Sequence, residues 1–305
     1  MLVFMTSPDN DPWDDSAVDR LLEVALQEDV GQGDITSCAV LSARQQAQGK
    51  IRAKGALVVA GLPLVPRLYS RLGAVQVQDL VDDGTAVSPG TVLLVARGDA
   101  RTLLTGERTV LNLLQHLSGI ATLTRRCVEA LEGSRCVLRD TRKTLPGLRS
   151  LEKYAVRVGG GTNHRTRLDD GVLIKDNHVD LVGGVGRAVR AARKALPDHA
   201  IEVECRTIEE VEEALDTGAD VILLDNMASE QLRRAVAIIG GRARVEASGG
   251  ITPERVREIA DLGVDYIAMG CLTHSAPAVD LSMDVERSES GSPPAPDGLS
   301  GPDGD

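Results

Sequence analysis

The sequence predicts a two-part α/β fold, in which an α/β sandwich is followed by a barrel of alternating strands and helices. In the first half, strand-like runs surround one or two helical segments, a pattern typical of an α+β sandwich. In the second half, short apolar runs alternate with helical patterns about every 20 to 30 residues, which indicates parallel βα units. About seven such units without a nucleotide-binding glycine fingerprint favour a closed barrel over an open sheet.

The two ends of the chain are polar and enclose the part that we expect to fold. Residues 1–15 are acidic and contain two prolines, which predicts a flexible arm. Residues 285–305 are rich in Ser, Gly, Pro and Asp and predict a disordered acidic tail. Between them we expect a sandwich domain at 16–118 and a barrel domain at 119–284.

Composition excludes several classes of protein. The 305 residues carry a net charge of −11 and only 2% are aromatic, which disfavours general nucleic-acid binding and base stacking, so we expect no nucleic-acid partner. No apolar run reaches the length of a membrane span, and the start lacks the basic region of a secretory signal. The five cysteines are widely spaced without a CxxC pair, which predicts neither disulfides nor a zinc site. We therefore expect a cytoplasmic protein.

The elements of the first half follow from periodicity. Apolar residues at helical spacing predict helices at 18–25, 65–72 and 107–118. The third helix has an apolar stripe with Arg108 on its opposite side, and Gly119 is a natural C-cap. Alternating and β-branched runs predict strands at Lys50–Ala53, Leu57–Ala60, Val75–Asp79 and Val92–Ala96.

The elements of the second half are short apolar strands with helices between them. Helical patterns include Ile208–Leu215 and Pro253–Leu262. The predicted strands are Cys136–Arg139, Tyr154–Val158, Val172–Ile174, Ile201–Val203, Val221–Leu224, Arg244–Val245 and Tyr266–Met269.

Polar residues or glycines follow nearly every strand predicted in the second half. In a barrel these positions lie on one rim, the face where such folds carry out chemistry. We therefore expect a functional site there. It would be built from Asp140, Thr141, Arg142, Lys143, Gly159–Gly161, Asn163, His164, Arg165, Lys175–His178, Glu204, Asp225, Asn226, Glu246, Ser248, Gly249, Gly250 and Gly270.

The charges along this rim indicate its ligands. Residues 139–178 hold nine Lys or Arg against five Asp or Glu, which predicts an anionic small substrate. The later strands supply the acids Glu204, Asp225 and Glu246, whose oxygens suit Mg²⁺ shared with a phosphate. The Ser248–Gly250 stretch lets backbone N–H groups approach a phosphate closely.

Structural roles are the alternatives. Glu204 and Asp225 could instead pair with Arg142 or Lys175 in a buried network. His164 could only orient its neighbours, His178 could be structural, and Gly159–Gly161 could be a tight turn. Cys205 and Cys271 follow strand ends, but small buried cysteines are commoner than nucleophiles.

At this point the motifs resemble those of the quinolinate phosphoribosyltransferase family, in order over roughly residues 17–284. The resemblance starts at Glu28–Thr36 and continues through the helix at 107–122. It then includes DTRKTLPG (140–147), LEKY (151–154), GGGTNHR (159–165), LIKDNH (173–178), IEVE (201–204), LDNM (224–227), EASGGI (246–251) and LTHS (272–275).

The resemblance implies an N-terminal α/β sandwich, an incomplete seven-stranded barrel and a homodimer in which the N-terminal domain covers the partner's barrel mouth. It also implies the conversion of quinolinate and phosphoribosyl pyrophosphate to nicotinate mononucleotide, pyrophosphate and CO₂, for de novo NAD synthesis. Lys143, Lys175, Glu204 and Asp225 would be the catalytic residues, the two acids holding Mg²⁺. Substrates would contact these four and Arg108 from the partner, Thr141, Arg142, His164, Arg165, Ser248, Gly249, Gly250 and Gly270.

Three rival functions stay open on the residues alone. Lys175 could be the amine of a Schiff-base aldolase. A related phosphoribosyltransferase could act on nicotinate or another acid. A non-catalytic anion-binding protein would bind ligand without releasing pyrophosphate.

Overall fold

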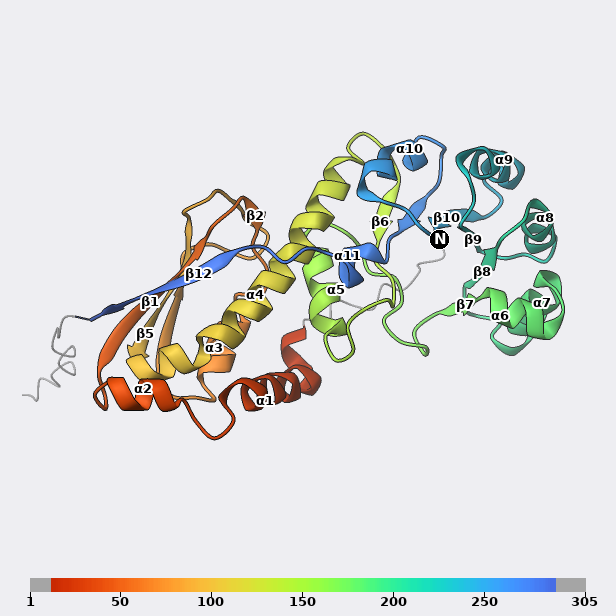
Figure 1. Ribbon diagram of the computed structural model, residues 1–305. Coiled ribbons are helices and arrows are strands. Elements are labelled where there is room, and N and C mark those ends of the chain that lie inside the picture. The colour runs from red at the N-terminus through yellow and green to blue at the C-terminus, as the bar shows by residue number, and fades with distance from the viewer. Residues whose placement is uncertain (1–11, 289–305) are drawn as a thin grey trace, which may run out of the picture.

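The computed structural model describes residues 12–288, which form two sheets joined by one long helix (Figure 1). The predicted arm and tail lie almost entirely in residues 1–11 and 289–305, outside the described residues. The two-part α/β fold predicted from the sequence is confirmed: an antiparallel sheet forms the first region and a parallel sheet forms the second.

The first region is a four-stranded antiparallel sheet in the order β12-β1-β5-β3. Along β1, buried and less buried residues alternate, so one face of the sheet packs on the core. β2 and β4 form a small separate pair, of which β4 was not predicted. The strands are β1 (Gln46–Ala53), β2 (Leu57–Val58), β3 (Val75–Asp79), β4 (Ala86–Val87), β5 (Val92–Asp99) and β12 (Leu281–Arg287).

Helices cover the inner face of this sheet. Asp15, Asp34 and Asp99 cap three of them by accepting hydrogen bonds from N–H groups of the first turn. The elements are a 3-10 turn at Pro12–Asp14, α1 (Ser16–Val30), α2 (Ile35–Val40), α3 (Leu64–Tyr69) and α4 (Ala100–Glu129).

Helix α4 is 30 residues long and passes from the first region into the second (Figure 1). The predicted C-cap at Gly119 is wrong, because the helix continues for ten residues beyond it. Gly119 is buried, and a Cβ there would come within 3.1 Å of the Pro277 carbonyl carbon. This glycine therefore permits close approach of the returning chain. The boundary placed between residues 118 and 119 falls inside the helix.

The second region is a parallel sheet of six strands in the order β6-β11-β10-β9-β8-β7. A single bridge from Arg139 to Thr162 stands where a seventh strand would pair with β6. Among residues 12–288 no pairing closes this sheet into a ring, so the predicted closure is not seen. The strands are β6 (Val137–Arg139), β7 (Val172–Ile174), β8 (Ile201–Cys205), β9 (Val221–Asp225), β10 (Arg244–Ser248) and β11 (Tyr266–Ala268).

The strand predicted at Tyr154–Val158 is wrong, because this segment is the second half of helix α5. The β-branched residues near its end favoured a strand, but Leu151 and Ala155 are both buried at the helical spacing of four. The helices of this region are α5 (Arg149–Val158), α6 (Asp176–Val182), α7 (Val185–Ala195), α8 (Ile208–Asp216), α9 (Ser229–Ile239), α10 (Val256–Ala260) after a 3-10 turn at Pro253–Arg255, and α11 (Cys271–His274).

The chain ends by returning to the first region. β12 pairs antiparallel with β1 from Ala47–Arg287 to Ala53–Leu281 (Figure 1). The domain boundaries expected from the sequence place residues 281–284 in the barrel and residues 285–287 in the tail. The described strand therefore crosses the boundary placed at residue 284 and belongs to the first sheet.

A partly buried contact joins the two regions to each other. The Tyr154 hydroxyl of α5 donates a 2.7 Å hydrogen bond to Asp83, whose carboxylate also accepts the N–H groups of Gly61 and Leu62. Burial raises the pKa of Asp83 above its usual value.

Within residues 12–288, no helix is long and apolar enough to cross a membrane.

Candidate active site

The predicted site residues lie where the parallel strands end. Lys175 directly follows β7, and Glu204 is the second-last residue of β8. Asp225 and Ser248 are the final residues of β9 and β10. Carboxyl ends of parallel strands share one edge of a sheet, so strand order brings these side chains to a common edge. Gly270 follows β11 at the same edge.

Lys175 and Glu204 form an ion pair across neighbouring strands. The Nζ of Lys175 lies 2.8 Å from Oε2 of Glu204, whose side chain is only 7% exposed, whereas that of Lys175 is 48% exposed. The pairing considered as a structural alternative is thus present. Because the ammonium is half open to solvent, it can still meet an anion.

Asp225 joins the glycine loop after β10. The next residue, Asn226, has a φ of 54° and donates its N–H to the carbonyl of Ser248 at 3.0 Å. A Cβ on Gly249 would lie 2.7 Å from the Asn226 nitrogen, so this position needs glycine. Gly250 also has a positive φ, of 58°. The loop therefore presents bare backbone beside the carboxylate of Asp225.

Lys143 packs on Gly270. A Cβ on Gly270 would come within 2.9 Å of Cδ of Lys143, so the missing side chain makes room for the lysine stem. The carbonyl of Lys143 accepts a 2.8 Å hydrogen bond from Thr273, and its N–H donates to the Thr141 hydroxyl at 3.0 Å. A neighbour in the same loop and a segment far along the chain, residues 270–273, thus fix this lysine.

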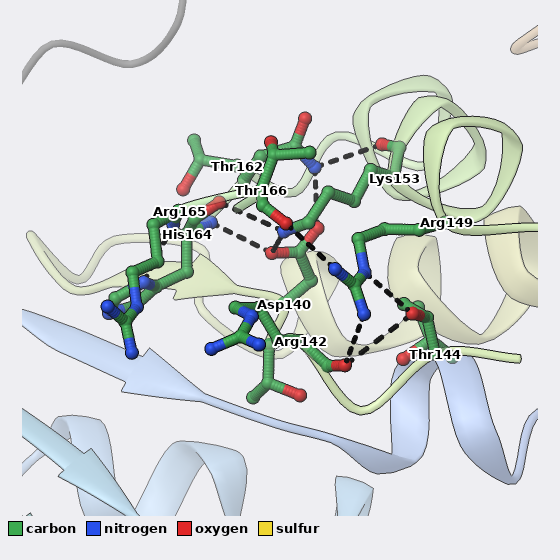
Figure 2. A network of polar contacts seen from close by, with 12 residues as sticks. Asp140, Arg142, Thr144, Arg149, Lys153, Thr162, His164, Arg165 and Thr166 are labelled. Atoms are coloured by element: carbon green, nitrogen blue, oxygen red, sulfur yellow. Dashed lines mark hydrogen bonds and ion pairs between the residues drawn. The ribbon is translucent and has the colours of Figure 1, made fainter. Parts of the chain in front are cut away.

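Arg142 and Arg165 bring two guanidinium groups together (Figure 2). Burial and the positive charge of Arg142 lower the pKa of Arg165 from its usual value. Arg165 donates to the Gly171 carbonyl at 3.0 Å, while the Nε of Arg142 is buried with no partner in the described part of the chain. An unpartnered buried cation donor is suited to an anion.

His164 lies beneath these arginines with its ring directed at buried acids. Its Nδ1 accepts the N–H of Arg165 at 2.7 Å, so the ring carries its proton on Nε2. That Nε2 lies 3.0 Å from Glu202 and 3.4 Å from Glu246. Glu246 in turn pairs with Arg139 at 2.8 Å. Nδ1 is therefore used within the protein, whereas Nε2 lies close to the two acids but forms no hydrogen bond among the described residues.

The charges of this cluster act on one another. Burial raises the pKa of Glu246 to about 7, the negative charge of Glu202 adds to the rise, and His164 and Arg139 oppose it. Burial alone would lower the pKa of His164, but Glu202 and Glu246 together raise it above its usual value.

Two groups of oxygen donors bear on metal binding. His164, Glu202 and Glu246 place one ligand atom each within 4.8 Å of one another. This cluster mixes an imidazole with two buried carboxylates, so it is not the all-oxygen set of ligands that Mg²⁺ prefers. Glu204 and Asp225 offer only carboxylate oxygens at the open edge, which is the donor chemistry that Mg²⁺ prefers.

Arg108 is the predicted site residue that the fold keeps apart. It is exposed on the first half of α4, and within residues 12–288 no hydrogen bond or ion pair joins it to the strand-end cluster.

Sequence reasoning missed four charged residues of the network: Glu202, Arg139, Arg149 and Lys153. Glu202 could have been found, because it precedes Glu204 by two residues in a strand and so faces the same way. Arg149 and Lys153 could not, because they lie on a helix that the sequence did not predict and not at a strand end, although Lys153 belongs to the LEKY motif.

Comparison with known families accounts for nearly the whole chain. Residues 34–118 match the family described as quinolinate phosphoribosyl transferase, N-terminal domain, and residues 120–284 match its C-terminal domain. Together the two matches span the antiparallel sheet, α4 and the parallel sheet.

Individual relatives agree. A probable nicotinate-nucleotide pyrophosphorylase [carboxylating] of Bacillus subtilis is 44% identical over 272 residues, 88% of this chain and 93% of that protein. The corresponding protein of Mycobacterium leprae is 44% identical over 268 residues, 86% of this chain and 94% of its own.

Solved structures repeat the architecture. NadC from Streptococcus pyogenes superposes with a TM-score of 0.84 at 42% identity, covering 91% of this chain and 99% of that one. A nicotinate-nucleotide pyrophosphorylase from Ehrlichia chaffeensis gives a TM-score of 0.85 at 40% identity, covering 88% and 98%. Sequence and fold thus agree along the same length, and the chain belongs to the quinolinate phosphoribosyltransferase family.

Proposed function

We propose that this protein is a carboxylating nicotinate-nucleotide pyrophosphorylase. It converts quinolinate and phosphoribosyl pyrophosphate to nicotinate mononucleotide, pyrophosphate and CO₂ in NAD biosynthesis. The observation that carries the proposal is the gathering of cations and acids at one edge of the parallel sheet: Arg142, Arg165 and Lys175 beside Glu204 and Asp225. The relatives named above carry the same activity in their names.

The cations bind the diacid. Quinolinate has two adjacent carboxylates, and the guanidinium groups of Arg142 and Arg165 offer planar pairs of donors to them. Lys175 adds a half-exposed ammonium. The unpartnered Nε of Arg142 would be left without an acceptor by a monoacid, so the site favours quinolinate over nicotinate.

The glycine positions hold the phosphoribosyl group. Gly249 and Gly250 have positive φ and expose their N–H groups to the 5′-phosphate after Ser248, and Gly270 completes the cradle beside Lys143. Glu204 and Asp225 then face the ribose.

The main task of this chain is to align its two substrates. The pyridine nitrogen attacks C1′ of the ribose as the C–O bond to pyrophosphate breaks, and positive charge develops on the ribose ring. The carboxylates of Glu204 and Asp225 stabilise that charge, while Lys143 and neighbouring arginines stabilise the departing pyrophosphate. The resulting pyridinium draws the electrons of the adjacent C–C bond as CO₂ leaves, and a proton takes its place on the ring.

Glu204 and Asp225 would also hold Mg²⁺, through their carboxylate oxygens. When bound, this ion supplies positive charge to the pyrophosphate oxygens. The residues fit this role because both acids lie at or next to the carboxyl ends of neighbouring parallel strands.

The deciding experiment is an assay of the purified protein with quinolinate, phosphoribosyl pyrophosphate and Mg²⁺. We expect equal amounts of pyrophosphate and CO₂. Pyrophosphate release with nicotinate instead, without CO₂, would contradict the proposed substrate. Binding without release of either product would contradict catalysis.

Because all five cysteines are free, we propose that the reaction takes place in the reducing cytoplasm.

We further propose that the active enzyme is a homodimer in which Arg108 enters the partner's site. Large apolar side chains are exposed both on the first region, at Ile35 and Val40, and around the strand-end edge, at Leu168 and Leu181. A partner copy would cover both sets.

Mixing two inactive proteins tests this arrangement. Arg108→Ala and Lys175→Ala disable different components, so a mixed dimer keeps one intact site and should regain part of the activity. If confirmed heterodimers stay inactive, each site is built within one chain.

A further inference from the structure

Helix α5 directs charged side chains at the two loops that carry the substrate cations. The first loop, residues 140–147, carries Arg142 and Lys143, and the second, residues 161–166, carries Arg165. From α5, Arg149 and Lys153 reach both loops (Figure 2).

Arg149 makes the outer connection. Its Nε donates to the Thr144 hydroxyl at 2.9 Å and its Nη2 lies 3.4 Å from the carbonyl of Arg142, both in the first loop. Its Nη1 donates to the carbonyl of Thr166 in the second loop at 3.1 Å. All three acceptors are neutral oxygens, so one guanidinium ties two loops without being neutralised by a carboxylate.

Lys153 and Asp140 make the inner connection. The Nζ of Lys153 lies 2.5 Å from Asp140 and donates to the carbonyl of His164 at 2.9 Å. Asp140 also accepts the N–H of His164 at 2.8 Å. Both side chains are almost completely buried, so this pair fixes the bases of the loops while Arg149 fixes their outer parts.

The loops need such a restraint because they carry like charges. The guanidinium groups of Arg142 and Arg165 lie on the same side of the network in Figure 2, and burial together with the charge of Arg142 lowers the pKa of Arg165. Without an anion between them they repel, and loops free to move would separate. A scaffold that holds them in place reduces the ordering cost that a bound dicarboxylate would otherwise meet.

We propose that Arg149 is a positioning residue that sets the spacing of Arg142 and Arg165 for a planar dicarboxylate. It acts through the backbone of Arg142 and Thr166 and through the Thr144 hydroxyl, and does not touch substrate. This inference rests on the proposed function, in which Arg142 and Arg165 bind quinolinate.

The test compares Arg149→Met, which keeps the apolar stem, with the wild type and with Arg125→Met. Arg125 is a matched control, because it also donates to backbone carbonyls, those of Val158 and Gly159, but at the far end of α5. For Arg149→Met we expect the KM for quinolinate to rise about 10- to 100-fold, with the KM for phosphoribosyl pyrophosphate within about twofold of wild type. Arg125→Met should change neither.

Direct binding gives a second readout. Calorimetric titration with quinolinate and with nicotinate should show that Arg149→Met weakens the diacid more than the monoacid. Arg149→Lys keeps the charge but loses the fork, so it should recover only part of the diacid affinity. Adding guanidinium ion to Arg149→Ala should lower the KM for quinolinate again.

The outcomes separate the two proposals. A wild-type protein that releases no pyrophosphate overturns the proposed function. An active wild type, with an Arg149→Met variant whose quinolinate KM is unchanged, overturns the positioning role. So does an equal rise in both KM values, which a general loss of structure would give. If Arg149→Met fails to fold, Thr144→Val removes one acceptor of Arg149, and an unchanged quinolinate KM there overturns the inference too.

Discussion

The two sheets are stabilised by different interactions. In the antiparallel sheet the interior is apolar, with Ile51, Leu94 and Leu103 fully buried, while its ion pairs, such as Lys50–Glu286, lie on the exposed side. In the described chain all the buried charged side chains belong to the second region: Arg139, Asp140, Glu152, Lys153, Glu202, Glu204 and Glu246.

The first region therefore contributes mainly to the stability of the fold, and the second also contributes the charged groups of the site. Apolar burial stabilises a fold at about 25 cal/mol per Å². Replacing a buried ion pair by apolar groups is often neutral or stabilising, so buried charges contribute little net stability. The second region contains seven of them, several of which contact groups of the site. Changes in the first sheet should therefore alter stability alone, whereas changes around the second should also alter activity.

The largest effect is expected from Arg142→Ala. Loss of a guanidinium that meets the substrate carboxylate should lower turnover by about a thousandfold or more. Pyrophosphate release and quinolinate binding measure it, with the exposed Arg97→Ala of β5 as the control. Near-normal quinolinate affinity in the Arg142 variant would refute its role as a carboxylate clamp.

Next in size is Leu94→Ala in the first sheet. Leu94 is 0% exposed, and the cavity left by the change should destabilise the protein by about 4 kcal/mol. Thermal or urea unfolding measures the loss. At temperatures where the variant is folded, kcat should equal that of wild type; a fall in kcat without a loss of stability would break the separation.

A smaller, pH-dependent effect is expected from Glu246→Gln. The pKa of Glu246 rises from 4.5 to about 7 on folding, so between these values the folded protein keeps a proton that the unfolded chain has lost. The free energy of unfolding is therefore highest below pH 4.5 and falls as pH rises through 7. The total fall is roughly 3 kcal/mol. The amide keeps an acceptor for Arg139 but does not titrate, so unfolding free energy should vary less between pH 4.5 and 7.

The exposed Glu23→Gln on α1 is the control for this pH series. If Glu246→Gln and wild type show the same pH dependence, another group is responsible for the destabilisation.

Periodicity predicted both sheets, because alternation and βα spacing are local properties of the chain. β3, for example, begins and ends where it was expected, at Val75–Asp79. Two features needed tertiary information. Gly119 is inside a helix because a distant segment packs on it, and the pairing of β12 with β1 joins opposite ends of the chain.

The site was predictable to the extent that strand ends share an edge. This rule located Lys175, Glu204, Asp225 and the Ser248–Gly250 loop. It could not locate residues that act from a helix behind the loops, as Arg149 does, or show that the His164 ring is directed inward at two buried acids.

The pairing of β12 with β1 also dictates an order of events on the ribosome. β1 is synthesised early and β12 only after the whole parallel sheet, so the nascent first sheet has an open edge throughout translation of the second region. Open strand edges are templates for pairing with other chains. The last described strand therefore covers β1 and becomes the outer edge itself, where the exposed charges of Asp284 and Glu286 oppose pairing with other chains, and any truncation before residue 281 leaves β1 open.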